Sequence, residues 1–136
     1  MAKSFDQAAV VPLRGGLVGM ITSSNGKRWV VPKGQIDPGH TPREAASIEA
    51  WEEAGWLGFL EPEPVGSYTY RKEGRDRNVL VFLMAVTDER DVWPEASYRC
   101  REWLTPEEAV QRIGEPGLQA IVRGLSAVAT SARDSA

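Results

Sequence analysis

Three closely spaced glutamates, Glu49, Glu52 and Glu53, are the residues of this sequence with the clearest chemical potential. If the segment is helical, positions i, i+3 and i+4 share a face, so the carboxylates lie within an arc of roughly 100°. They repel one another, and no lysine or arginine follows Arg43 within the segment to offset this repulsion. Because oxygen ligands suit hard divalent cations, the cluster is a candidate metal site. A solvated acidic helix face is the alternative that the same spacing allows.

The sequence around the glutamates carries signals for the start and the end of a helix. Thr41 is a candidate N-cap, Pro42 suits the first helical position, and Glu44 completes a capping box. Gly55 is suited to the residue that follows the helix. We therefore expect a helix over residues 42–54, with the glutamates in its second half.

The segment from Gly34 to Trp56 resembles the Nudix box, G-x5-E-x7-R-E-U-x-E-E-x-G-U, in which U is a bulky apolar residue. The glycines, the three glutamates and the closing apolar residue match at their spacings. His40 stands where the family has glutamate, and Ile48 where it has arginine. We identify residues 34–56 as a Nudix box that is degenerate at two positions.

The resemblance implies a fold, a cofactor and roles for individual residues. The fold is a Nudix-type α/β/α sandwich, of the α+β class, with a mixed central sheet flanked by helices. The cofactor is Mg²⁺ or Mn²⁺, bound by Glu52, Glu53 and the Gly34 carbonyl, with Glu49 as a further ligand or as the group that orients and deprotonates the attacking water. Such ions neutralise charge on phosphate oxygens and activate water.

The two departures from the box have two interpretations. In the family pattern the loop glutamate and the helix arginine help to hold the loop and the helix around the carboxylates. Because both are replaced here, neither leaves a stranded charge. Either apolar packing by Ile48 and a neutral His40 substitutes for the ion pair, or the enzyme is slowed because Glu49 has lost its orienting arginine.

The elements around the box predict a layered α+β domain over residues 1–136. Strands are expected at residues 8–12 and 17–22 around a turn at 14–16, at 29–31, at 67–71, at 78–86 and at 101–104. Residues 32–40, with two prolines and two glycines, predict a loop, and residues 72–77 a hairpin tip. Helices are expected at residues 106–113 and 118–129.

Outside the box the chain resembles the diphosphoinositol polyphosphate and diadenosine polyphosphate branch of the family. The similar stretches are residues 23–34, residues 70–83, and Trp93 with residues 101–103. Basic residues concentrate near the box and in the later hairpin, and arginine and lysine both suit phosphate. The residues that we expect to bind substrate are Lys33, Arg28, Arg71, Arg75 and Arg77.

Three aspects of this site stay open at the level of the sequence. The basic hairpin residues also suit a solvated tip, because Glu73 and Asp76 partly neutralise them. Tyr68 and Trp93 suit the core as well as stacking on a base. Glu95, in the loop before the last strand, is a possible additional carboxylate.

The resemblance implies a metal-dependent pyrophosphohydrolase that cleaves a phosphoanhydride bond in dinucleoside polyphosphates or diphosphoinositol polyphosphates. One alternative is a housecleaning hydrolase for nucleoside triphosphates or nucleotide sugars. A second is a catalytically weak ligand-binding module, which the changes at His40 and Ile48 favour and the intact glutamates oppose.

Composition limits the remaining possibilities. With 136 residues, 42% hydrophobic and 26% charged, the chain has the composition of a globular domain. A net charge of -3 argues against nucleic acid or a membrane surface as a partner. The single cysteine, Cys100, and the lack of a long apolar stretch lead us to expect a cytoplasmic protein. We also expect a monomer or a homodimer, and the resemblance implies a polyphosphorylated small molecule as its partner.

Overall fold

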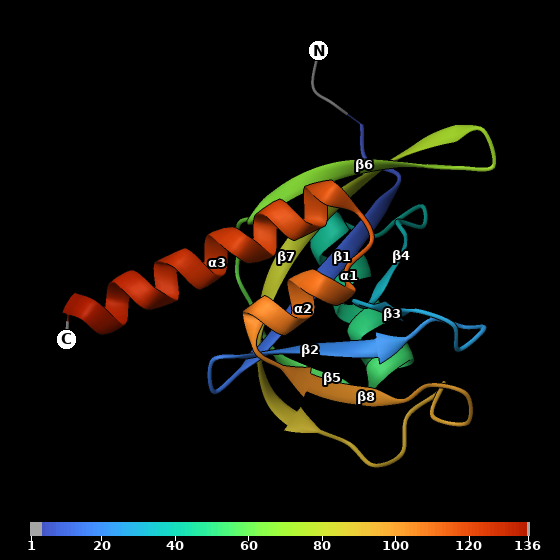
Figure 1. Ribbon diagram of the computed structural model, residues 1–136. Coiled ribbons are helices and arrows are strands. Elements are labelled where there is room, and N and C mark those ends of the chain that lie inside the picture. Colours follow the sequence, from blue (N-terminus) through green and yellow to red (C-terminus); the bar gives the residue numbers. More distant parts are fainter. Residues whose placement is uncertain (1–3, 136) are drawn as a thin grey trace.

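A mixed β-sheet with helices on both faces organises the computed structural model, which describes residues 4–135 and the side chains as far as residue 125 (Figure 1). The elements are β1 (Gln7–Arg14), β2 (Leu17–Thr22), β3 (Trp29–Val30), β4 (Lys33–Gln35), α1 (Pro42–Glu49), η1 (Ala50–Ala54), β5 (Trp56–Leu60), β6 (Gly66–Lys72), β7 (Arg75–Glu89), β8 (Arg101–Leu104), α2 (Pro106–Arg112) and α3 (Pro116–Ser135). Within the described residues, no helix is long and apolar enough to cross a bilayer.

The strands β1 and β7 form the centre of the sheet. They run parallel to each other over seven residue pairs, and the remaining strand pairs of the described sheet are antiparallel. The main path through the sheet is β3-β2-β1-β7-β5, while β4 pairs with β1, β6 with β7 and β8 with β2. The pairing of β4 with β1 brings the first glycine of the box to the middle of the molecule.

Successive residues of β1 point to opposite faces, as strand geometry requires. Ala8 and Val10 belong to an apolar cluster with α1, η1 and the buried Trp56. Ala9 and Val11 belong to a second cluster with residues of α2 and α3. The strand is therefore buried on both sides, and α1 lies behind the sheet when α2 and α3 lie in front of it (Figure 1). The predicted α+β architecture, a mixed sheet between helices, is confirmed.

Both predicted hairpins form, each around two residues with positive φ. Gly15 and Gly16 have φ values of 58° and 80° between β1 and β2. Glu73 and Gly74, at 53° and 74°, join β6 to β7. This conformation matches the twist of the strands that such a turn connects. The second turn is shorter than the predicted tip over residues 72–77, because pairing continues to Lys72 and Arg75.

Two strands were not predicted. Residues 33–35 lie within the segment predicted as a loop, yet they form β4, because β1 offers them an antiparallel partner. Residues 56–60 follow the box helix and form β5, which pairs with β7. In both cases long-range pairing, rather than local periodicity, determines the structure. The strand at 101–104 and the helix α2 form close to their predicted ranges, whereas α3 begins two residues before and ends six residues after the predicted range of 118–129.

Candidate functional site

The predicted glutamates lie on a helix that changes type in its second half. The capping box is confirmed: the Thr41 hydroxyl accepts from the Glu44 N–H at 3.1 Å, and the Glu44 carboxylate accepts from the Thr41 N–H at 2.8 Å. After Glu49 the helix continues as a π-helical turn, η1. It ends at Gly55, whose φ of 69° is left-handed, as the sequence predicted. π-Helical turns are rare in proteins, but those that occur are often found at functional sites.

Glu49 lies directly against Gly34 of β4. A Cβ atom on Gly34 would lie 2.3 Å from the carboxyl carbon and from Oε1 of Glu49, so a side chain at position 34 would displace the carboxylate. Gly34 is held in this place by its antiparallel pairing with Ala8 of β1. The structure thus brings together two of the predicted metal-binding residues, and Gly34 is a glycine because the Glu49 carboxylate occupies the space of a side chain.

Glu53 is the more enclosed of the two neighbouring carboxylates, with its side chain 12% exposed. Its Oε1 atom accepts a hydrogen bond from the backbone N–H of Lys33 at 3.1 Å. Its Oε2 atom lies 3.6 Å from Nη2 of Arg99. The two oxygens are therefore held from two sides, by β4 and by a cation from a distant part of the chain.

Burial and mutual repulsion make the carboxylates of Glu49 and Glu53 hold protons more tightly than usual. Burial, followed by the charge of Glu53, raises the pKa of Glu49 to about 8, and the protonated carboxyl donates a hydrogen bond to Glu53. Burial also raises the pKa of Glu53, although the Lys33 N–H and the Arg99 guanidinium oppose this shift. A divalent cation would replace this proton and relieve the repulsion.

The donor set of the site fits a hard divalent cation. Glu49 and Glu53 supply carboxylate oxygen atoms, which Mg²⁺ and Mn²⁺ prefer. Glu52 is half-buried on the same π-helical turn. Among the described residues, no three side chains of His, Cys, Asp or Glu stand close enough together to hold an ion. Magnesium needs only one or two protein carboxylates, because it keeps several waters and takes further ligands from substrate phosphates.

Residues 90–100, here called the 90–100 loop, cover the end of the site helix. The Glu95 N–H donates to the carbonyl of Glu52 at 3.0 Å, and the Trp93 indole N–H donates to the carbonyl of Glu53 at 2.9 Å. The guanidinium of Arg101 lies 3.9 Å from the centre of the Trp93 ring. The loop thereby brings Glu95, the predicted additional carboxylate, to the site, where its charge contributes to the raised pKa of Glu49.

Neither aromatic candidate for base stacking is free to stack. Tyr68 is 5% exposed and belongs to the cluster beneath α2 and α3. Trp93 packs under Arg101 and hydrogen-bonds to the helix end. Both residues are thus part of the packing, which was the other possibility left open by the sequence.

A cavity of about 270 Å³ opens beside the carboxylate of Glu53. Its lining includes four cationic side chains and one aromatic ring besides that carboxylate: Arg28, Lys33, Lys72, Arg99 and Tyr70. The Lys33 Nζ atom lies 4.1 Å from the centre of the Tyr70 ring. The arrangement places positive charge from β4, β6 and two loops next to the acidic pair, which suits a polyanion.

The cavity gathers two of the five residues predicted to bind substrate, Arg28 and Lys33. The others, Arg71, Arg75 and Arg77, lie on the β6–β7 hairpin outside the cavity lining. Arg71 forms an ion pair with Asp76 at 3.2 Å, consistent with the solvated-tip interpretation of this residue. Strand alternation explains this for Arg71 alone, because Tyr70 and Lys72 share one face of β6 and Arg71 points to the other. Arg75 and Arg77 pair with Lys72 and Tyr70, so they lie on the same face as these two residues without lining the cavity.

Sequence reasoning missed Arg99 and did not assign Lys72 to the substrate site. Lys72 stood among the basic residues of the hairpin, and only its register on β6 distinguishes it from Arg71. Arg99 lies in the 90–100 loop, for which the sequence predicted no regular structure. Its spacing of i+4 from Glu95 is a signal for an ion pair, and the two side chains do pair at 2.7 Å.

The two degenerate box positions carry no ion pair between them. His40 is exposed, and its backbone N–H donates to the Asp37 carbonyl at 3.1 Å. Ile48 is half-buried on α1. The loop is instead attached by Ile36, which packs against the α1 cluster and whose N–H donates to the Asp6 carbonyl at 3.1 Å. Apolar packing and backbone hydrogen bonds therefore hold the loop.

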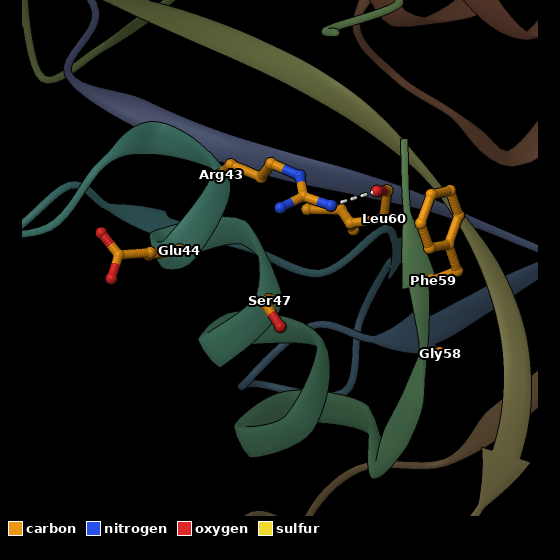
Figure 2. A pocket seen from close by; sticks show the side chains of 6 residues that line it. All are labelled: Arg43, Glu44, Ser47, Gly58, Phe59 and Leu60. Carbon is orange, nitrogen blue, oxygen red and sulfur yellow. Dashed lines mark hydrogen bonds between the residues drawn. The ribbon is translucent and has the colours of Figure 1, made fainter. Parts of the chain in front are cut away.

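A second cavity, of about 300 Å³, lies between α1 and β5 and shares no lining residue with the first (Figure 2). Arg43 points into it and donates to the carbonyls of Leu60 and Glu61 at the end of β5. Phe59 forms part of the wall and is 55% exposed. Arg43, although it lies within the box in sequence, thus caps a strand end rather than facing the acidic pair.

Comparison with known proteins agrees with this geometry. The NUDIX domain model matches residues 5–125, so the chain belongs to the Nudix family. It is 36% identical over 114 residues to Nudix hydrolase 16, mitochondrial, of Arabidopsis thaliana, which covers 77% of this chain and 63% of that protein. It is 34% identical over 86 residues to the mouse (Mus musculus) diphosphoinositol polyphosphate phosphohydrolase 3-alpha, covering 62% of this chain and 51% of that protein. The chain thus spans about half to two thirds of the length of these relatives.

Solved structures share the fold. The C. elegans Ap4A hydrolase superposes with a TM-score of 0.74 at 21% identity, covering 92% of this chain and 98% of that one. A Nudix hydrolase from Nitrosomonas europaea gives the same TM-score at 17% identity, covering 91% and 90%. The predicted Nudix-type sandwich is therefore confirmed.

Proposed function

We propose that this protein is a divalent-metal-dependent pyrophosphohydrolase that cleaves a phosphoanhydride bond in a polyphosphorylated small molecule. The observation that carries the proposal is the acidic pair, Glu49 and Glu53, of which Glu53 lines a cavity with four cationic side chains. Hydrolysis of a phosphoanhydride needs both features. The cationic side chains neutralise the phosphate chain, and the acidic pair serves to activate the water that attacks phosphorus. The names of the relatives, which are hydrolases, support the same activity.

In the proposed reaction, a water oxygen forms a bond to phosphorus as the bridging P–O bond breaks. Glu49 takes the proton from water, because burial and the neighbouring charge of Glu53 raise its pKa and make its carboxylate a stronger base than an ordinary glutamate. Glu52, Glu53 and the Gly34 carbonyl would hold the cation, and its charge would stabilise the phosphate oxygens in the transition state. Lys33 and Arg28 bind the phosphates that do not react.

The lining of the cavity favours a substrate recognised through its phosphates rather than through a base. Tyr70 is the aromatic residue among the described lining, and the Lys33 ammonium lies 4.1 Å from the centre of its ring. A base that stacked on this side of the ring would have to displace Lys33, losing a cation–π contact. Of the two substrate classes that the sequence suggests, diphosphoinositol polyphosphates therefore fit better than dinucleoside polyphosphates.

The metal assignment is tested by Glu53→Gln, which keeps the size of the side chain and removes its charge. We expect kcat to fall by roughly 100-fold or more, because a neutral amide is a poor ligand for Mg²⁺. The matched control is Glu63→Gln, an exposed glutamate between β5 and β6 that should leave kcat unchanged. Turnover of Glu53→Gln at the wild-type rate would exclude this metal site.

The substrate is tested by a hydrolysis screen with Mg²⁺ and with Mn²⁺. The panel contains diphosphoinositol polyphosphates, dinucleoside polyphosphates, nucleotide sugars and nucleoside triphosphates. We expect the highest kcat/KM with a diphosphoinositol polyphosphate and release of inorganic phosphate. Pyrophosphate and a nucleoside monophosphate as the main products would instead favour a housecleaning hydrolase, and no turnover with either metal would favour a ligand-binding module.

A further inference from the structure

An arginine from outside the box, Arg99, contacts the carboxylate of Glu53. Its Nη2 atom lies 3.6 Å from Oε2 of Glu53 and 2.7 Å from Oε1 of Glu95. The Arg99 side chain is only 8% exposed, so these two carboxylates, rather than water, balance its charge. Position 48 of α1, by contrast, holds an isoleucine, which offers the carboxylates neither a charge nor a hydrogen-bond donor.

The position of Arg99 is fixed by contacts that do not involve α1. Its Nη1 atom donates to the carbonyl of Thr22 at 2.9 Å, and its Nε atom donates to Oε1 of Glu95 at 3.0 Å. The next residue, Cys100, exchanges two hydrogen bonds with Thr22: its N–H donates to the hydroxyl at 2.9 Å and its carbonyl accepts from the N–H at 3.0 Å. Because Thr22 ends β2, the guanidinium is attached to the sheet.

The Glu53 carboxylate therefore meets one fixed group at each oxygen. The Lys33 N–H holds Oε1 from β4, and the Arg99 guanidinium faces Oε2 from the 90–100 loop. We infer that Arg99 is the positioning residue of the Glu53 carboxylate, and that it supplies from this loop the cation that α1 lacks at position 48. The inference rests on the proposed function, since it assigns Arg99 a role at the proposed metal site.

A second arginine makes a matched comparison possible. Arg101, at the start of β8, is also largely buried, with its side chain 13% exposed. It donates to the carbonyls of Ala54 and Arg90 and lies 3.6 Å from Glu89, so it ties the same loop to the helix end. Its ion pair is with Glu89 rather than with a carboxylate of the site. Substitution of either arginine should therefore loosen the loop, whereas only substitution of Arg99 should also affect the position of the Glu53 carboxylate.

The test compares Arg99→Met, Arg99→Lys and Arg101→Lys with the wild type. Mn²⁺ binding is measured without substrate by the loss of the free-ion electron paramagnetic resonance signal, and kcat is measured beside it. We expect both Arg99 variants to bind Mn²⁺ about tenfold or more weakly, with lysine less affected than methionine, because residues that orient a ligand typically have effects of this size. Arg101→Lys should keep the wild-type affinity, even if its melting temperature falls.

The possible results separate the inference from the proposed function. If the wild type binds Mn²⁺ and both Arg99 variants bind it equally well, Arg99 does not position Glu53. Tighter binding by Arg99→Met would also overturn the inference, since it would show that Arg99 only opposes the charge of the metal. A wild type that binds no Mn²⁺ would overturn both the inference and the proposed metal site. If Arg99→Met does not fold, Arg99→Lys provides the same comparison.

Discussion

The contact between Gly34 and Glu49 shows how a missing side chain shapes the candidate site. The Glu49 carboxylate occupies the volume in which a Cβ atom of residue 34 would lie, 2.3 Å from the carboxyl carbon. Burial of this carboxylate is the main cause of its raised pKa, followed by the charge of Glu53. At the scale of single residues, the chemistry thus depends on one glycine as much as on the glutamates.

Gly34→Ala is expected to reduce activity more than stability. The added methyl group forces the flexible end of Glu49 to move, which costs little folding free energy but displaces the carboxylate from the reacting water. We expect kcat to fall by roughly tenfold or more, with a small change in melting temperature. Gly114→Ala is the matched control, because a Cβ atom there would meet nothing within 4 Å. A wild-type kcat for Gly34→Ala would show that the position of Glu49 is not critical.

At the scale of elements, two helices of this chain begin with the same device. Thr41 and Thr105 each precede a proline, and each forms a complete capping box with a glutamate at the third helical position. Only α1 leads into the π-helical turn that carries Glu52 and Glu53. The two capping boxes should therefore contribute similarly to the free energy of unfolding, whereas only the one at Thr41 helps to position the candidate site.

Thr41→Ala and Thr105→Ala should separate these contributions. Each substitution removes the cap and should lower the free energy of unfolding by about 1 kcal/mol. Only Thr41→Ala should also lower kcat several-fold, because α1 positions the acidic pair. Urea denaturation and steady-state kinetics on both variants measure the two effects. Equal losses of kcat would indicate that overall stability, rather than the placement of α1, limits the reaction.

At the scale of the whole molecule, the acidic pair links folding to pH and metal. The folded-state pKa of Glu49 is about 8, above its usual value near 4.5, and that of Glu53 is also raised. Between pH 4.5 and about pH 8, the folded protein therefore binds more protons than the unfolded chain. The free energy of unfolding falls as the pH rises through this range. The lowered pKa values of Glu44 and Glu89 act in the opposite sense, at a pH near or below 4.5.

Metal-free protein is thus expected to melt several degrees lower at pH 8 than at pH 6. Glu49→Gln should remove most of this dependence, since the amide carries no proton to lose. Adding Mg²⁺ or Mn²⁺ at pH 8 should raise the melting temperature of the wild type, because the ion binds only the folded site. Differential scanning fluorimetry across this pH range, with chelator or with metal, measures the pH dependence of the wild type, its loss in Glu49→Gln and the effect of the metal. A melting temperature that rises from pH 6 to pH 8 without metal would contradict the burial of this pair.

The helix of the site could be predicted from the sequence because its signals are local. The cap at Thr41, the stop at Gly55 and the spacing of the three glutamates act over a few residues, so the order of the residues suffices to define them. The same holds for the hairpin at Gly15 and Gly16. The resemblance to the Nudix box also predicted the fold, and the family match and the solved structures confirm it.

The surroundings of the helix were decided only by the tertiary structure. Residues 33–35 become a strand because β1 pairs with them, and that pairing sets Gly34 against Glu49. Register on β6 brings Lys72 to the cavity and turns Arg71 away, and the 90–100 loop brings Arg99 to Glu53. Strand pairing and loop placement depend on burial between segments far apart in the chain. The sequence by itself therefore indicated which carboxylates form the candidate site, and the packing of distant segments determined which cations surround them.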